Sequence, residues 1–187
     1  MAIAYLNPGT AVDITNWDSS LTSELAQGET ANTWQTTANN SNLTVGLTDF
    51  DFSGLGASSI TSVQVVLVGN YDARSGAWSA NTNILNSSSV SLYSDLLSVP
   101  AGRSASTISG TVRTTSDGST AWTDSDLDGM QLRVSSVDCT DKGQMIQLYI
   151  KVIYSTGYGN TVNGVTAANI GKINGVATAS ISKVNGI

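Results

Sequence analysis

Apolar and polar residues alternate along the stretch from residue 121 to residue 154. The period is two from 130 to 135, and it is two again from 146 to 152, where the second face is half apolar. This period is typical of β-strands, and a mixed second face is typical of a strand covered on both sides. A short acidic link at 138–143 joins the two runs, so we expect them to be antiparallel neighbours. The residues that would share one face in each run are Met130, Leu132 and Val134, then Ile146, Leu148, Ile150 and Val152.

Similar runs earlier in the chain predict further strands. They lie at 43–47, with Phe50 and Phe52 continuing the alternation, and at 60–68, 90–93, 96–99 and 108–112. Residues 70–86 form a polar excursion that contains Trp78, and Asp117-Gly118 is a hairpin signal. No sustained helical period separates these runs. The pattern therefore predicts an all-β fold, an antiparallel β-sandwich of the jelly-roll kind.

Three parts follow from this pattern: an irregular N-terminal arm at 1–40, the sandwich at 41–155, and a linker with a repeat tail at 156–187. Within the arm, only 12–14 resembles a short strand. The arm carries Trp17 and Trp34. These rings either close the open edge of the sandwich or anchor the arm to another subunit, since tryptophan is enriched at interface centres.

The tail contains an internal repeat of eleven residues. Copies begin at Val162-Asn163-Gly164-Val165, at Ile173-Asn174-Gly175-Val176 and at Val184-Asn185-Gly186-Ile187. An Asn-Gly pair between β-branched residues is the strongest short signal for a two-residue hairpin turn. The repeat therefore predicts a series of short β-hairpins.

Hairpins of this size cannot bury their own apolar residues in water. One possibility is that the tail folds back on its own sandwich. We favour a second, in which tails of neighbouring subunits pack together or on a partner by adding strands to an exposed edge. The tail residues expected to be covered are Ile170, Ile173, Val176, Ile181, Val184 and Ile187.

Composition narrows the classes of function. The 187 residues carry a net charge of -6, with eight basic residues scattered along the chain, which argues against nucleic acid as a partner. The N-terminus lacks the features of a secretory signal, and no window is apolar enough for a membrane span, so we expect synthesis in the host cytoplasm. One cysteine, Cys139, excludes an internal disulfide.

The candidate chemistry is sparse. Without histidine there is no ordinary nucleophilic triad, no His-bearing zinc site and no expected cofactor. Asp124, Asp126 and Asp128, followed by Gly129, match half of a calcium loop. However, Ser135 stands where a glutamate is needed, so an Asp-rich turn is the preferred interpretation.

Aromatic side chains offer a second possibility. Trp78, Trp122 and Tyr71 would stack on sugar rings if they were exposed, whereas the alternative is that they belong to the core or rim of the sandwich.

The order of the strand signatures resembles the jelly-roll sandwich of structural proteins from tailed bacteriophages. The resemblance covers residues 43–154 and rests on the runs 43–53, 60–69, 121–135 and 152–154. It implies a non-enzymatic virion protein, first a capsid decoration or cement protein. Such a protein would bind the major capsid protein or other virion subunits and form a homo-oligomer, plausibly a trimer. The alternatives are a glycan- or receptor-binding module of a tail fibre or baseplate and, last, a glycan-cleaving enzyme.

Overall fold

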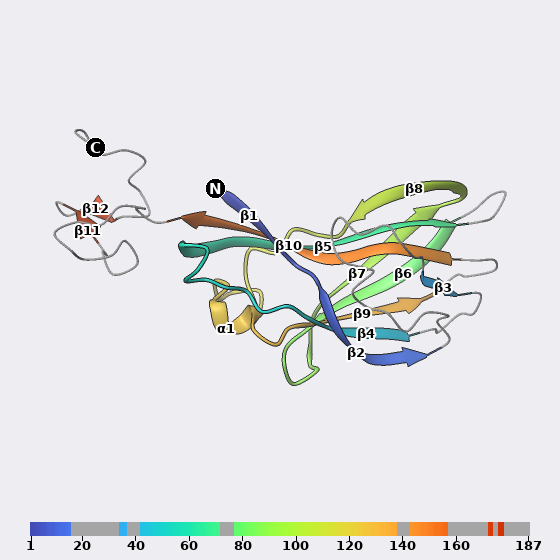
Figure 1. The fold of residues 1–187 in the computed structure, drawn as a ribbon, viewed down its shortest axis with the longest axis horizontal. Coiled ribbons are helices and arrows are strands. Elements are labelled where there is room, and N and C mark those ends of the chain that lie inside the picture. The colour runs from blue at the N-terminus through green and yellow to red at the C-terminus, as the bar shows by residue number, and fades with distance from the viewer. Residues whose placement is uncertain are drawn as a thin grey trace.

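A computed structural model describes residues 1–15, 34–36, 42–71, 77–137, 143–156, 172–173 and 176–177. This part of the chain forms an antiparallel β-sandwich with one very short helix, as the sequence pattern predicts (Figure 1). No helix in these ranges is both long and apolar enough to span a membrane. The elements are β1 (Ala2–Leu6), β2 (Pro8–Thr15), β3 (Trp34–Thr36), β4 (Asn42–Leu47), β5 (Ala57–Tyr71), β6 (Ala77–Leu85), β7 (Ser91–Pro100), β8 (Gly102–Ser109), α1 (Asp124–Leu127), β9 (Gln131–Ser136), β10 (Gly143–Thr156), β11 (Lys172–Ile173) and β12 (Val176–Ala177).

Two sheets make up the sandwich. The first has the order β1-β10-β5-β8, with β3 also paired to β10, and the second has the order β2-β4-β9-β6-β7. Their facing sides bury the predicted alternating residues: Val63, Val65 and Leu67 of β5 are at most 1% exposed, and Leu132 and Val134 of β9 are fully buried. The period-two pattern therefore identifies the core face of the longest strands correctly.

β9 and β10 are not neighbours, which corrects one expectation. β9 lies between β4 and β6 in the second sheet, whereas β10 lies between β1 and β5 in the first. Both edges of β9 are thus occupied by strands that come earlier in the chain. The link at 138–142, which lies outside the described residues, joins one sheet to the other instead of closing a hairpin.

A β-bulge in β10 shifts the predicted alternation. The register with β5 slips between Met145 and Gln147, where Ile146 has no partner. As a result Met145 is fully buried, and the half-exposed Ile146 leaves the core face that the sequence assigned to it. One extra residue in a strand moves each side chain that precedes it to the opposite face of the sheet. From Leu148 onward the prediction holds.

The N-terminal segment is more regular than expected. β1 pairs with β10 over Ala2–Leu6, and β2 pairs with β4, so residues 2–15 supply one strand to each sheet. The description of an irregular arm therefore does not apply to this segment. Only Asn7 separates the two strands, so the chain passes from one sheet to the other within a single residue. Further along, Trp34 pairs with Met145 of β10.

The predicted polar excursion at 70–86 is also corrected. Its second half is β6, which pairs with both β7 and β9. Trp78 is fully buried there, and its indole Nε1 donates to the Ser136 hydroxyl at 3.0 Å. Ser79, Asn81 and Asn83 alternate with the buried residues of β6, and Thr82 lies among the buried ones, so this internal strand has a mainly polar composition.

One repeat hairpin falls within the described residues. β11 and β12 pair antiparallel, with Ile173 opposite Val176, so that the link between them is Asn174-Gly175. The second copy of the repeat is therefore a hairpin with a two-residue loop, as predicted. This two-stranded sheet joins neither sheet of the sandwich and is drawn apart from them in Figure 1.

Candidate functional site

A polar hollow of about 400 Å³ opens at the α1 end of the sandwich. Three segments surround it: the β6–β7 turn with the start of β7, the turn at 115–121, and α1, which follows that turn closely in sequence. All but one of its lining side chains are polar, and none is basic. They are Asn86, Ser87, Leu92, Ser116, Asp117, Thr120, Ser125 and Asp126.

Asn86 shapes the first wall. Its Oδ1 accepts hydrogen bonds from the backbone N–H groups of Ser88 and Val90, both at 3.0 Å. Asparagine favours such turns because its short amide reaches the backbone two residues on. Ser89 adopts the left-handed region at a φ of 62°, and its hydroxyl donates to Gln131 at 3.1 Å. The contacts of Asn86 and Ser89 thereby fix the β6–β7 turn, and Ser87 in this turn lines the hollow.

Asp117 organises the second wall. Its Oδ1 accepts from the N–H and hydroxyl of Ser119 and from the N–H of Thr120, while Oδ2 accepts from the Thr120 hydroxyl. The backbone N–H of Thr120, followed by that of Ser119, is the main reason that the pKa of this carboxyl lies far below its ordinary value of 3.8. Asp117 therefore carries a fixed negative charge, with three donors on Oδ1 and one on Oδ2.

Tyr93 ties this second wall to the body of the sandwich. Its hydroxyl donates to the Thr115 carbonyl at 2.6 Å and accepts from the Gly118 N–H at 2.9 Å. The ring packs against Trp122, with centroids 6.2 Å apart, and the Arg113 guanidinium lies 4.5 Å above it. Each contact holds the turn at 115–121 against β7, so the hollow is built on a rigid support.

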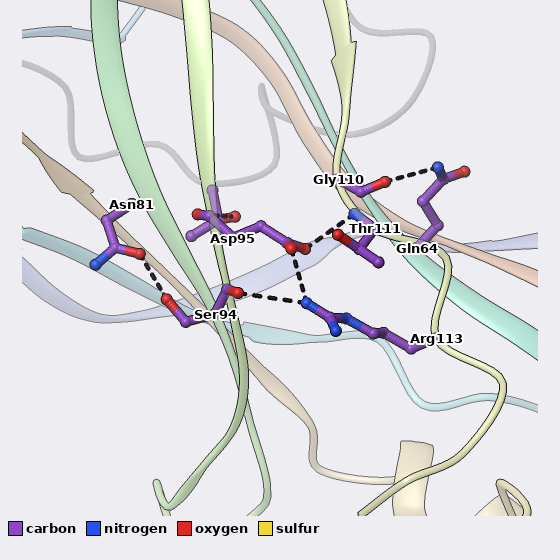
Figure 2. A network of polar contacts seen from close by, with 8 residues as sticks. Gln64, Asn81, Ser94, Asp95, Gly110, Thr111 and Arg113 are labelled. Carbon is purple, nitrogen blue, oxygen red and sulfur yellow. Dashed lines mark hydrogen bonds and ion pairs between the residues drawn. The ribbon is translucent and has the colours of Figure 1, made fainter. Parts of the chain in front are cut away.

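A polar network next to Tyr93 fixes Arg113 in place (Figure 2). Its Nη2 donates to Asp95 Oδ1 at 2.7 Å and to the Ser94 carbonyl at 3.3 Å, and Asp95 Oδ2 accepts from the Thr111 N–H. Gly110 is required at this point, because a Cβ there would lie 2.6 Å from Asp95 Oδ2. The pair is partly buried, so it orients the segment at 110–115; Nη2 carries both hydrogen bonds, and the buried Nε makes none within the described residues.

α1 forms the third wall. Asp126 Oδ2 accepts from the N–H of Thr123 at 2.8 Å and from its hydroxyl at 2.7 Å, which stabilises the start of this single turn. Oδ1 of Asp126 makes no hydrogen bond within the described part of the chain, and neither do the hydroxyls of Ser87 and Ser125. The hollow therefore offers free acceptors and hydroxyls on two of its walls.

The aspartates of the half calcium loop are not gathered as metal ligands would be. Asp126 is turned toward Thr123, and among the described residues no three acidic, cysteine or histidine side chains gather as metal ligands would. Asp124 lies in a different environment: burial, followed by the charge of Asp128, raises its pKa above 3.8. The segment expected to be an Asp-rich turn contains one helical turn, α1.

The three aromatic candidates belong to the core. Trp78 is 0% exposed, Tyr71 2% and Trp122 4%, and the indole Nε1 of Trp122 donates to the Arg113 carbonyl at 2.9 Å. None of these rings can form a stacking surface for a sugar. Of the two interpretations of these residues, the one that placed them in the core or rim is correct.

The three predicted partner-binding residues that the structure describes do not lie in one sheet. Trp17, Ile170, Ile181, Val184 and Ile187 lie outside the described residues, as does Cys139. Trp34, Ile173 and Val176 lie in described strands, but they belong to separate sheets. Their role in binding a partner stays a prediction.

Sequence reasoning singled out Asp117 and Asp126 as parts of two separate turns, but it missed the site that they share. The signal for the site lies in tertiary structure. Nothing in the sequence places the turn after β6 against the turn at 115–121.

Comparisons with known proteins show only remote structural similarity. No family model matches the chain, and no curated protein matches it. A CBM36-1 domain of a multidomain xylanase from the hindgut metagenome of Trinervitermes trinervoides aligns at 8% identity and a TM-score of 0.41, covering 86% of this chain and 100% of that one. CBM35 from Cellvibrio japonicus aligns at 12% identity and 0.44, covering 83% and 95%.

A CBM22-1 xylan-binding domain from Paenibacillus barcinonensis aligns at 12% identity and a TM-score of 0.41, covering 81% of this chain and 94% of that one. At these values the similarity says nothing about a ligand of this chain. None of the three is a virion protein.

Proposed function

We propose that this protein is a non-catalytic binding module that takes a hydroxyl-rich ligand, a glycan, in the polar hollow. The observation that carries the proposal is the lining itself. Hydroxyls of Ser87 and Ser125 and a carboxylate oxygen of Asp126, all unbonded within the described residues, lie around a volume suited to one or two sugar rings. These are the groups that pair with sugar hydroxyls as both donors and acceptors.

The support beneath the hollow favours binding over catalysis. Cleavage of a glycosidic bond needs one carboxyl group that holds a proton near neutral pH. Asp117 is ionised because the N–H groups of Thr120 and Ser119 stabilise its charge. The second carboxylate in the lining, Asp126, is engaged at the start of α1. Neither is placed as a proton donor, whereas both can orient a ligand.

A glycan array probed with the labelled full chain, followed by titration of the best-bound glycan, tests this function. The double variant Ser87→Ala/Ser125→Ala should weaken binding about thirtyfold, since each hydroxyl contributes about 1 kcal/mol. Ser88→Ala is the matched control, because Ser88 lies in the same turn but does not line the hollow. The absence of saturable binding, or equal binding by all three proteins, would contradict the proposal.

A second candidate is assembly through the repeat tail. The specific observation is the β11–β12 hairpin, which pairs with neither sandwich sheet, although two-residue strands are too short to be stable alone. We infer that such hairpins are covered by copies in a homo-oligomer or by another subunit. In a virion these subunits would include the major capsid protein. This role also fits the resemblance to phage proteins.

Deletion of residues 162–187 tests the assembly candidate. Light scattering should report a smaller mass for the shortened chain than for the full chain, while thermal unfolding of the sandwich stays unchanged. An unchanged mass would rule out self-association through the tail. Unchanged binding to purified particles would rule out a virion partner for the tail.

A further inference from the structure

The hollow is acidic as well as polar. Two of its eight lining residues are aspartates and none is lysine or arginine. The nearby Arg113 does not compensate this charge, because its guanidinium is engaged by Asp95 at 2.7 Å and by the Tyr93 ring at 4.5 Å. The hollow therefore repels anionic ligands and attracts cationic ones.

The two carboxylates contribute in different ways. Asp117 is held in its turn by four hydrogen bonds from Ser119 and Thr120, so its charge and its position are fixed. Asp126 uses Oδ2 for Thr123 and keeps Oδ1 free within the described residues. An ammonium group has only donors, so a free carboxylate oxygen is its natural partner.

Resting on the glycan-binding function proposed above, we propose that the hollow selects an amino sugar whose protonated amine donates to Asp126 Oδ1. Its ring hydroxyls then pair with Ser87 and Ser125. A bare metal ion fits less well, since no three metal-ligating side chains gather in the described part of the chain. A polyamine would leave the hydroxyls of the hollow without partners.

Matched trisaccharides test the charge requirement. Amide chemical shifts of the labelled full chain are followed at mildly acidic pH with a glucosamine trisaccharide, with its N-acetylated form and with cellotriose. We expect the free-amine sugar to bind about three- to fivefold more tightly than cellotriose at low salt, the range of one exposed ion pair. The preference should disappear at about 0.5 M salt, where surface charges are screened.

The variant Asp126→Asn locates the effect. It keeps an oxygen for Thr123 and should bring the free-amine sugar to the level of cellotriose. Asp128→Asn removes the same charge outside the lining and should leave the preference intact. Equal binding of all three sugars, or an equal loss in both variants, overturns the charge selection and leaves the glycan-binding function standing. If no sugar shifts the amides of the hollow, both proposals fall.

Discussion

Tyr93→Phe is the sharpest test of how the hollow is held. The substitution keeps the ring, its packing on Trp122 and its contact with Arg113, and it removes only the hydroxyl. That hydroxyl bonds the Thr115 carbonyl in a partly buried position and the Gly118 N–H in an exposed one. A partly buried hydrogen bond contributes about 1 kcal/mol, and an exposed one contributes a few tenths of that.

The free energy of unfolding should therefore fall by about 1–1.5 kcal/mol, which corresponds to about 3–5 °C in Tm for a chain of this size. Urea unfolding followed by tryptophan fluorescence measures the first quantity and calorimetry the second. Hydrogen exchange at the Gly118 amide should also accelerate, because this N–H loses its acceptor.

Tyr5→Phe is the control. The Tyr5 ring packs edge-on against Tyr149 at 5.4 Å, but its hydroxyl makes no hydrogen bond within the described residues, so stability should change by less than about 0.5 kcal/mol. If both variants unfold at the same urea concentration as the parent, the hydroxyl of Tyr93 does not hold the turn, and the rigid support of the hollow is refuted.

Three further predictions concern charge and packing. Asp124→Asn should stabilise the fold at neutral pH, because burial and the charge of Asp128 disfavour the ionised carboxyl. Since its folded pKa is raised, stability is lost as pH rises through that pKa, so urea midpoints of parent and variant should converge at low pH and separate above it. Asp117→Asn should destabilise at neutral pH, and because its folded pKa is lowered, the difference should shrink as pH falls below 3.8; a constant difference would show that Thr120 and Ser119 do not stabilise the charge of this carboxyl. Gly143→Ala should cost about 1–3 kcal/mol in chemical unfolding, because its Cβ would lie 2.8 Å from the Trp78 ring, and an unchanged midpoint would show that the ring yields freely.

Period-two patterning predicted the fold class because burial on one face is a local property of a strand. Leu132, Val134, Val63 and Val65 were all placed on the core face for this reason. The pattern failed where local composition and tertiary structure disagree. β6 reads as polar because Ser79, Asn81 and Asn83 lie between its buried residues, and β9 and β10 were paired although a sheet change separates them.

The polar hollow could not be predicted from the sequence for a related reason. Asp117 satisfies its own turn and Asn86 satisfies another, so each has a complete local explanation. Their meeting depends on Tyr93, which joins β7 to the turn at 115–121 through a hydroxyl that no periodicity reveals. The hairpin at Ile173 and Val176 was predictable, because its two-residue loop is specified by adjacent residues alone.

The pairing of Ala2–Leu6 with Ile150–Tyr154 also bears on how the protein is made. During synthesis β1 emerges early and waits for a partner that is translated almost at the far end of the sandwich. Its first sheet cannot close in the meantime, and contacts of such long range form slowly. A waiting strand with unpaired edges is prone to aggregation. A chaperone that shields the nascent chain should therefore raise the yield of folded protein.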